Sequence, residues 1–246
     1  MGIFFNFNKE GKGVTKQDVA SESPIKRFFT EFIHRFWQLV LLNAIYLLAC
    51  IPIITIGPAT AAMNYVCRNF SQAKPAYFFS DFIEKCKEHF KQGILVGIIQ
   101  LAVGALLSTS LYSWVYGEFD APAIFRTVAV VVIFIFGYLL LFGSFYIYPM
   151  MVSFDLKIKQ LIRNSVILAL TQFWRNIVIF LVLVALLLLT YLFWPLTLPL
   201  PLFLGFTLMA YVSNALIFPV LERYVAAPVQ EKTAESVEKS EEDPAE

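Results

Sequence analysis

The residue types that most often carry chemistry are few and scattered in this chain. Its three cysteines, Cys50, Cys67 and Cys86, form no CxxC pair, and its two histidines, His34 and His89, lie far apart in the sequence. A zinc site needs three or four convergent ligands. We therefore interpret the cysteines as small apolar side chains and the histidines as interfacial groups, and we predict no metal site.

The sequence also lacks the short motifs of common enzymes. It contains no G-x-x-x-x-G-K-[ST] phosphate loop, no G-x-S-x-G nucleophile elbow and no H-E-x-x-H zinc motif. We therefore predict no catalytic residue, no cofactor and no nucleic-acid partner, and we do not expect an enzyme.

The distribution of charge indicates a membrane protein. Only 15% of the 246 residues are charged and 59% are hydrophobic, whereas soluble domains carry about 25% charged residues. Four runs without Asp, Glu, Lys or Arg cover about 32, 26, 28 and 46 residues, at 36–67, 92–117, 127–154 and 176–221. A bilayer core needs roughly 20 apolar helical residues. The fold class predicted is therefore an all-α, multi-pass helical bundle with about five spans.

The expected organisation has three parts. Residues 1–24 are predicted to be a flexible cytoplasmic arm, 25–224 a membrane domain and 225–246 a disordered acidic tail. The predicted spans are 37–54 with a short return at 59–70, 93–116, 127–148, 177–194 and 201–219. Interfacial amphipathic helices are expected at 25–36, 77–91 and 154–163.

A proline-rich break follows the first span. Pro52, Gly57 and Pro58 interrupt helical hydrogen bonding, and freed backbone groups at membrane depth must be covered by protein or water. We expect a re-entrant hairpin there, with Asn43 bonding a freed carbonyl. Similar Ile-aromatic-Pro junctions occur at Pro149 and Pro219 and suggest a repeated unit.

The polar residues within the apolar runs are neutral. They are Asn43, Thr55, Asn64, Gln100 and Asn214. A proton relay would need titratable groups, so we favour hydrogen bonds between helices, with contacts to sugar hydroxyls as the alternative. One helical face of 93–116 is predicted to serve helix packing or to form a groove; its members are Gly93, Gly97, Gln100, Gly104 and Ser108.

The orientation follows from Lys and Arg, which mark the cytoplasmic side. The connection at 149–175 is basic, whereas those at 117–126 and 195–201 carry little or no positive charge. The first apolar segment is flanked by basic residues on both sides. We therefore expect both termini in the cytoplasm and a first segment that turns back at the break.

Residues 36–70 resemble the YesL-like bacterial membrane proteins, a family defined by domain of unknown function 624. The resemblance runs from Phe36-Trp37 through Cys50-Ile51-Pro52 to Tyr65-Val66-x-Arg68-Asn69-Phe70. It implies a multi-pass protein of the bacterial cytoplasmic membrane, with a link to carbohydrate uptake and no catalytic residue to carry over. The signature residues expected to form the re-entrant break are Asn43, Tyr46, Pro52, Thr55, Gly57, Pro58 and Thr60.

Three function classes remain open from the sequence. The first is a non-enzymatic accessory protein of a carbohydrate or solute uptake system. The second is a transporter or channel for a small polar solute, and the third is a lipid-interacting envelope protein. The expected partners are the lipid bilayer and, as further candidates, a membrane transport complex or a second copy of the chain.

Overall fold

A computed structural model describes residues 24–117, 122–154, 156–192 and 201–223. Every regular element in these ranges is helical, which confirms the all-α prediction. The expected arm at 1–24, apart from Pro24, and the expected tail at 225–246 lie outside the described residues. The elements are α2 (Pro24–His34), α3 (Phe36–Ala49), η1 (Ile53–Thr55), α4 (Ile56–Ser71), α5 (Phe78–Glu88), α6 (Phe90–Tyr116), α7 (Ala123–Met151), α8 (Ile158–Thr171), α9 (Phe173–Leu192), η2 (Pro201–Gly205) and α10 (Phe206–Leu221).

Four described helices are long and apolar enough to cross a membrane. They are α6, α7, α9 and the helix at Phe203–Leu221. A fifth span results if α2 and α3, which meet at a bend of 68°, count as one broken segment. About five spans were predicted, and the chain is a membrane protein by this criterion.

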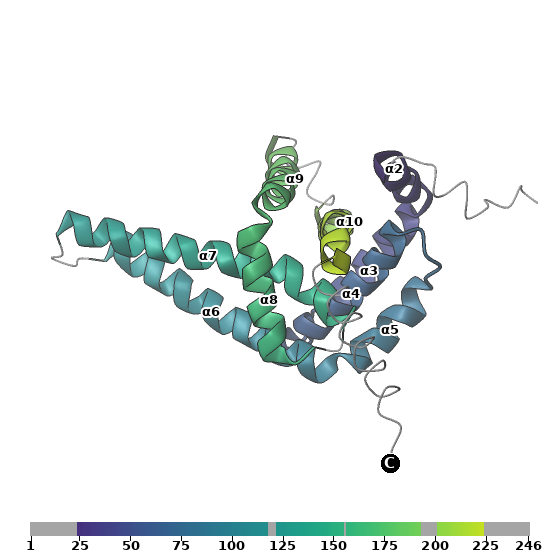
Figure 1. Cartoon of the computed structure of the whole chain (residues 1–246), viewed down its shortest axis with the longest axis horizontal. Coiled ribbons are helices and arrows are strands. Elements are labelled where there is room, and N and C mark those ends of the chain that lie inside the picture. Colours follow the sequence, from purple (N-terminus) through teal and green to yellow (C-terminus); the bar gives the residue numbers. More distant parts are fainter. Residues whose placement is uncertain (1–23, 118–121, 155, 193–200, 224–246) are drawn as a thin grey trace, which may run out of the picture.

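Helix α4 lies at the centre of the molecule (Figure 1), between α3, α5, α6 and α10. Most of its 16 residues are buried, and Val66, Cys67 and Phe70 are completely covered. Its sequence is rich in alanine, which lets neighbouring helices approach closely. A second core forms where α7, α8, α9 and α10 meet, around Tyr146, Met150 and Ile217.

Helices α6 and α7 form a long antiparallel hairpin that projects from this centre (Figure 1). Their outer side chains are widely exposed, for example Leu106 at 66% and Phe134 at 63%. In both helices only 11% of the most apolar 18-residue window is buried. These surfaces must therefore be covered by lipid or by another membrane protein.

Helix α4 ends in a Schellman motif. The N–H of Ala73 donates to Phe70 O at 3.1 Å, and the N–H of Lys74 donates to Asn69 O at 2.9 Å. Ala73 takes a φ of 55°, the left-handed conformation that usually belongs to glycine. This motif fixes where the chain leaves α4 and therefore where Lys74 lies.

The element boundaries differ from prediction mainly at prolines. The return helix begins at Ile56, so Gly57 and Pro58 lie in its first turn rather than before it. Pro149 and Pro219 lie inside α7 and α10, each two residues before the helix end. Helix α7 was expected to end before Pro149 but continues to Met151. Proline lacks the N–H of one helical hydrogen bond, and this loss is tolerated so close to the end of the helix.

The third amphipathic stretch lies later than expected. Residues 154–163 were predicted, but α8 begins at Ile158 and continues to Thr171. Helix α9 then begins at Phe173, four residues before the predicted span, and residues 193–200 lie outside the described part.

Candidate functional site at the proline break

The connection between α3 and α4 is short and internally bonded. After Cys50, Pro52 is extended (φ −78°, ψ 120°), and Ile53–Thr55 forms one 3₁₀ turn. The Thr55 hydroxyl donates to Ala49 O at 2.5 Å or to Pro52 O at 2.6 Å. Thr55 therefore satisfies a carbonyl group left free at or just after the end of α3, as a break at membrane depth requires.

The first turn of α4 packs directly on the glycine face of α6. A Cβ atom at Gly57 would lie 1.9 Å from Gly93 O, and one at Gly93 would lie 2.6 Å from Pro58 N. A Cβ atom at Gly97 would lie 3.2 Å from the Cα of Gly57. The structure thus brings together two of the predicted groups, the proline break and the small-residue face.

The outer part of the same α6 face contacts α7. Gln100 donates to the Ser144 hydroxyl at 3.0 Å and accepts from the Tyr148 hydroxyl at 2.7 Å. Gly104 lies near Leu140, whose Cδ2 would be 3.6 Å from an added Cβ. The Ser108 hydroxyl donates to Gly104 O within its own helix. Only Gly93 and Gly97 are therefore needed as glycines for close packing.

A second polar contact joins α3 to α4 beside the break. The hydroxyls of Tyr46 and Thr60 lie 3.2 Å apart, and Thr60 also donates to Ile56 O at 2.6 Å. Cys50 lies one helical turn after Tyr46, and both side chains lie near Tyr148. Helices α3, α4, α6 and α7 thus bring their polar side chains to one region, which we call the break cluster: Tyr46, Cys50, Thr60, Gln100, Ser144 and Tyr148.

Asn43 links α3 to a helix far along the chain. Its Oδ1 accepts the backbone N–H of Thr207 at 3.1 Å, in the first turn of α10. The Thr207 hydroxyl in turn donates to Leu39 O at 3.1 Å. The first-turn N–H groups of a helix have no partner within it. Asn43 therefore joins α3 to the beginning of α10, a contact between residues 164 positions apart.

Asn64 and Asn214 meet where α4 crosses α10. Asn214 Nδ2 donates to Asn64 Oδ1 at 2.7 Å, and Asn64 Nδ2 donates to Thr60 O at 2.8 Å. The Asn214 Oδ1 and Ser213 Oγ atoms are buried without a hydrogen-bond partner among the described residues. This pair is a fixed link between the two most buried helices.

Sequence reasoning missed two other polar groups. The first is Asn176 in α9, which accepts from the Tyr146 hydroxyl at 2.7 Å and donates to Ala169 O at 2.7 Å. The second is Arg68, which donates to Val152 O at 3.2 Å and to the Ser153 hydroxyl at 2.7 Å. Asn176 follows Arg175 and is the first residue of the longest charge-free run. From the sequence it was therefore grouped with the interfacial residues rather than with the polar residues inside a span.

The break cluster can hydrogen-bond but offers no strong acid, base or metal ligand set. Its members are tyrosine, threonine, serine and glutamine side chains with one thiol. In the described part of the chain, no three His, Cys, Asp or Glu side chains gather as metal ligands. A cavity of about 340 Å³ between α6, α7 and α8 is lined mainly by apolar groups, with Gln100, Ser144 and Ser165 as its polar members.

Comparison with known proteins finds a family model that matches part of the chain. Residues 39–111 match the family model described as protein of unknown function, DUF624. The chain is 28% identical over 195 residues to the uncharacterized protein YteU of Bacillus subtilis (strain 168), an alignment that covers 78% of this chain and 83% of YteU. No solved structure matches the chain. The matched segment runs from α3 to α6 and contains the break, α4 and the glycine face, so over these residues the chain is similar to the DUF624 family.

Proposed function

We propose that this protein is a non-enzymatic membrane subunit that acts beside a carbohydrate or solute uptake system by packing against another membrane protein. The observation that carries the proposal is the exposed α6–α7 hairpin. In each of its two helices only 11% of the most apolar 18-residue window is buried, and the pair projects from the rest of the fold (Figure 1). A projecting pair of this kind provides a large surface for another membrane protein.

The polar groups support a packing role. Asn43, Asn64, Gln100 and Asn214 each form a hydrogen bond between helices. Such bonds hold membrane helices together at about 0.6 kcal/mol each. Side chains used in this way stabilise one arrangement of the helices and are not free to select a solute.

The link to sugar uptake rests on the resemblance to YesL-like proteins, which are often encoded beside sugar-import genes. We place the protein in the bacterial cytoplasmic membrane, with both termini in the cytoplasm. The partner is then a permease subunit in the same membrane. A second copy of the chain is the other candidate for the hairpin surface.

Site-specific photo-crosslinking in cells tests the proposal. A crosslinking amino acid replaces Leu106 or Phe134 on the exposed hairpin, and Tyr146, which is completely buried, serves as the matched control. We expect adducts with one transport-system protein from the two exposed positions and none from position 146. Adducts with lipid alone, or only with other copies of this chain, would overturn the accessory role.

The break cluster favours a second candidate, a channel or transporter for a small polar solute. Broken helices and neutral hydrogen-bonding groups often line solute sites in transporters. The test is flux of sugars and sugar alcohols into proteoliposomes that contain the purified protein alone. Flux that Tyr148→Phe or Gln100→Leu abolishes would favour this candidate, and the absence of any flux would exclude it for those solutes.

A further inference from the structure

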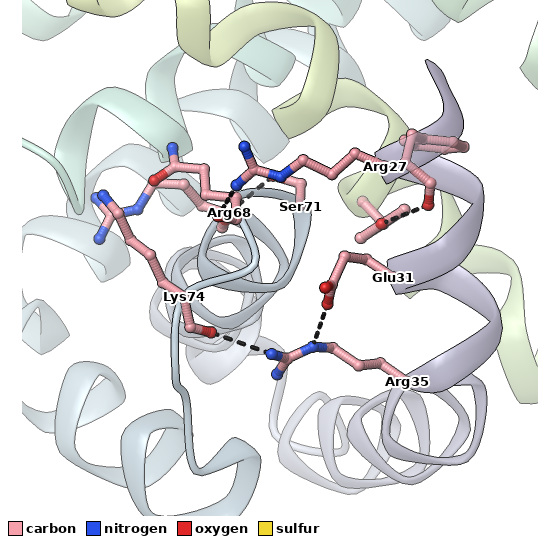
Figure 2. A network of polar contacts seen from close by, with 9 residues as sticks. Arg27, Glu31, Arg35, Arg68, Ser71 and Lys74 are labelled. Carbon is pink, nitrogen blue, oxygen red and sulfur yellow. Dashed lines mark hydrogen bonds and ion pairs between the residues drawn. The ribbon is translucent and has the colours of Figure 1, made fainter. Parts of the chain in front are cut away.

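Five cationic side chains surround the C-terminal end of α4. They come from α2, from the residue between α2 and α3, from α4, from the connection after α4 and from α5, and we call them the basic collar: Arg27, Arg35, Arg68, Lys74 and Lys85. Figure 2 shows four of them, with Glu31 the carboxylate labelled beside them. A helix C-terminus carries partial negative charge, which accounts for one or two cations at this place but not for five.

Two members of the collar cap the end of α4. Arg27 donates to Gln72 O, and Arg35 donates to Lys74 O at 3.3 Å. The Arg35 guanidinium also lies 4.6 Å from the centre of the Phe70 ring. These contacts bring the beginning of α3 and the end of α4 to the same level of the molecule.

The other three cations share two aromatic rings. The Arg68 guanidinium lies 4.7 Å from the Tyr65 ring centre and 5.7 Å from that of Phe218. Lys74 Nζ lies 5.9 Å from the Phe218 ring centre, and Lys85 Nζ lies 5.1 Å from that of Tyr65. Like charges held this close repel each other unless an anion lies nearby.

The carboxylates of the described residues do not neutralise the collar. Glu31 pairs with Arg35 at 2.8 Å and Glu88 pairs with Lys85 at 2.5 Å. Five cations and these two carboxylates leave a net charge of +3, which Glu84, a further carboxylate acting on Lys85, lowers to +2. No described carboxylate pairs with Arg27, Arg68 or Lys74. Asp155 follows Ser153 closely in sequence but lies outside the described residues, so the experiment below includes it.

Unpaired polar atoms lie inside the collar as well. The donors Arg27 Nε and Gln72 Nε2 and the acceptor Gln72 Oε1 are shielded from solvent, and none has a hydrogen-bond partner among the described residues. Burying a polar atom without a partner costs about 1–3 kcal/mol. An anion with several oxygen atoms would satisfy the two donors.

Exposed apolar side chains beside the collar indicate its depth in the membrane. Phe29 is 57% exposed, Ile33 71% and Trp37 74%. They lie on α2 and at the beginning of α3, next to Arg27 and Arg35 in sequence. Aromatic and apolar side chains beside Lys and Arg are typical of the boundary between acyl chains and headgroups.

We propose that the basic collar binds the phosphate groups of anionic phospholipids. The cations, the unpaired donors and the apolar flank match a phosphate that carries acyl chains. The collar would then fix the depth and tilt of the α2–α3–α4 unit in the membrane. This proposal does not depend on the accessory role.

The test measures which lipids remain bound to the full-length protein. The protein is purified in mild detergent with an equal mixture of phosphatidylglycerol and phosphatidylcholine, and retained lipid is counted by native mass spectrometry. We expect the wild type to retain phosphatidylglycerol in preference to phosphatidylcholine. Each basic residue near a membrane contributes about fivefold to binding, so Lys74→Gln with Lys85→Gln should weaken retention by about tenfold or more.

The matched control removes two exposed cations from α8, Lys159→Gln with Arg163→Gln. Because these two cations lie outside the collar, its retention should fall clearly less than that of Lys74→Gln with Lys85→Gln. Equal losses in both double variants would show diffuse attraction and overturn the site. A further contrary outcome is a wild type that binds both lipids equally while Asp155→Asn prefers phosphatidylglycerol. That result would identify Asp155 as the anion that neutralises the collar, and it would also overturn the lipid site. Inorganic phosphate that displaces the lipid completely would point to a soluble anion instead.

Discussion

The carbonyl oxygen of Gly93 occupies the space that a side chain at Gly57 would need. A Cβ atom at position 57 would lie 1.9 Å from that oxygen, well inside van der Waals contact. The first turn of α4 and the first turns of α6 therefore touch through their backbones. This contact fixes α4 against a membrane-spanning helix, and it depends on two residues without side chains.

We predict that Gly57→Ala strongly destabilises the protein. The added methyl group meets backbone rather than a flexible side chain, so α4 and α6 must separate, and overpacking of this kind costs about 1–3 kcal/mol or more. Thermal unfolding in detergent, followed by size-exclusion chromatography, measures the effect. Gly137→Ala is the matched control because no atom lies within 4 Å of its added Cβ; an equal loss there would contradict the packing argument.

The sequence predicted the glycine face of α6 but not its partner. Spacing of small residues shows that a helix approaches closely, and charge-free runs show which helices cross the membrane. Neither pattern identifies the helix that packs against the glycine face of α6. The partner is the first turn of α4, because Thr55 bonds the end of α3 and turns the chain so that Gly57 and Pro58 meet Gly93.

The same limit applies to the polar residues. Asn43 was predicted to bond a freed carbonyl at the break; its Oδ1 accepts from the N–H of Thr207 in α10, a contact that the sequence did not predict. An amide side chain in an apolar run indicates that a hydrogen bond is formed. Its partner cannot be predicted from the sequence, because it depends on how helices far apart in the chain pack together. The basic flanks were more informative, because Arg35 and Lys74 indeed come together at one level.

Replacement of Asn43 tests the link between α3 and α10. We predict that Asn43→Leu lowers stability by about 1–3 kcal/mol, because the N–H of Thr207 stays buried without that acceptor. Unfolding in detergent measures the change, and Asn164→Leu on α8 is the amide control. If both variants melt together with the wild type, the link contributes nothing to stability.

A double-mutant cycle tests the contact between Gln100 and Tyr148. Hydrogen bonds between membrane helices average about 0.6 kcal/mol and reach about 1.7 kcal/mol. We expect Gln100→Leu and Tyr148→Phe to show a coupling of that size in unfolding free energy, since the two groups lie 2.7 Å apart. Purely additive losses would mean that the two side chains do not bond in the membrane.

The end of α4 offers a stabilising substitution. Ala73 holds a φ of 55°, which costs an L-residue roughly 1–2 kcal/mol relative to glycine. Glycine loses more freedom on folding, so we predict that Ala73→Gly stabilises by about 0.5–1 kcal/mol. Unfolding measurements should show a higher midpoint, while Ala76→Gly outside the motif should not; a lower midpoint for Ala73→Gly would contradict the Schellman geometry.

Cysteine accessibility in intact cells tests the predicted topology. Cys50 and Cys86 are replaced, whereas Cys67 can stay because it is completely buried. We predict that new cysteines at Asp120 and Leu198 react with a membrane-impermeant reagent, since their connections carry few cations. Cysteines at Lys159 and Lys239 should react only after permeabilisation.

The same labelling decides whether the first segment turns back. Arg35 precedes α3 and Lys74 follows α4, and their contact brings both ends of the α3–α4 hairpin to one level. Because both flanks are basic, we predict that this level is cytoplasmic. Cysteines at Thr15 and Lys74 should therefore both be protected in intact cells. A Thr15 cysteine that reacts from outside while the Lys74 cysteine stays protected would instead show a single full crossing, with the N-terminus outside.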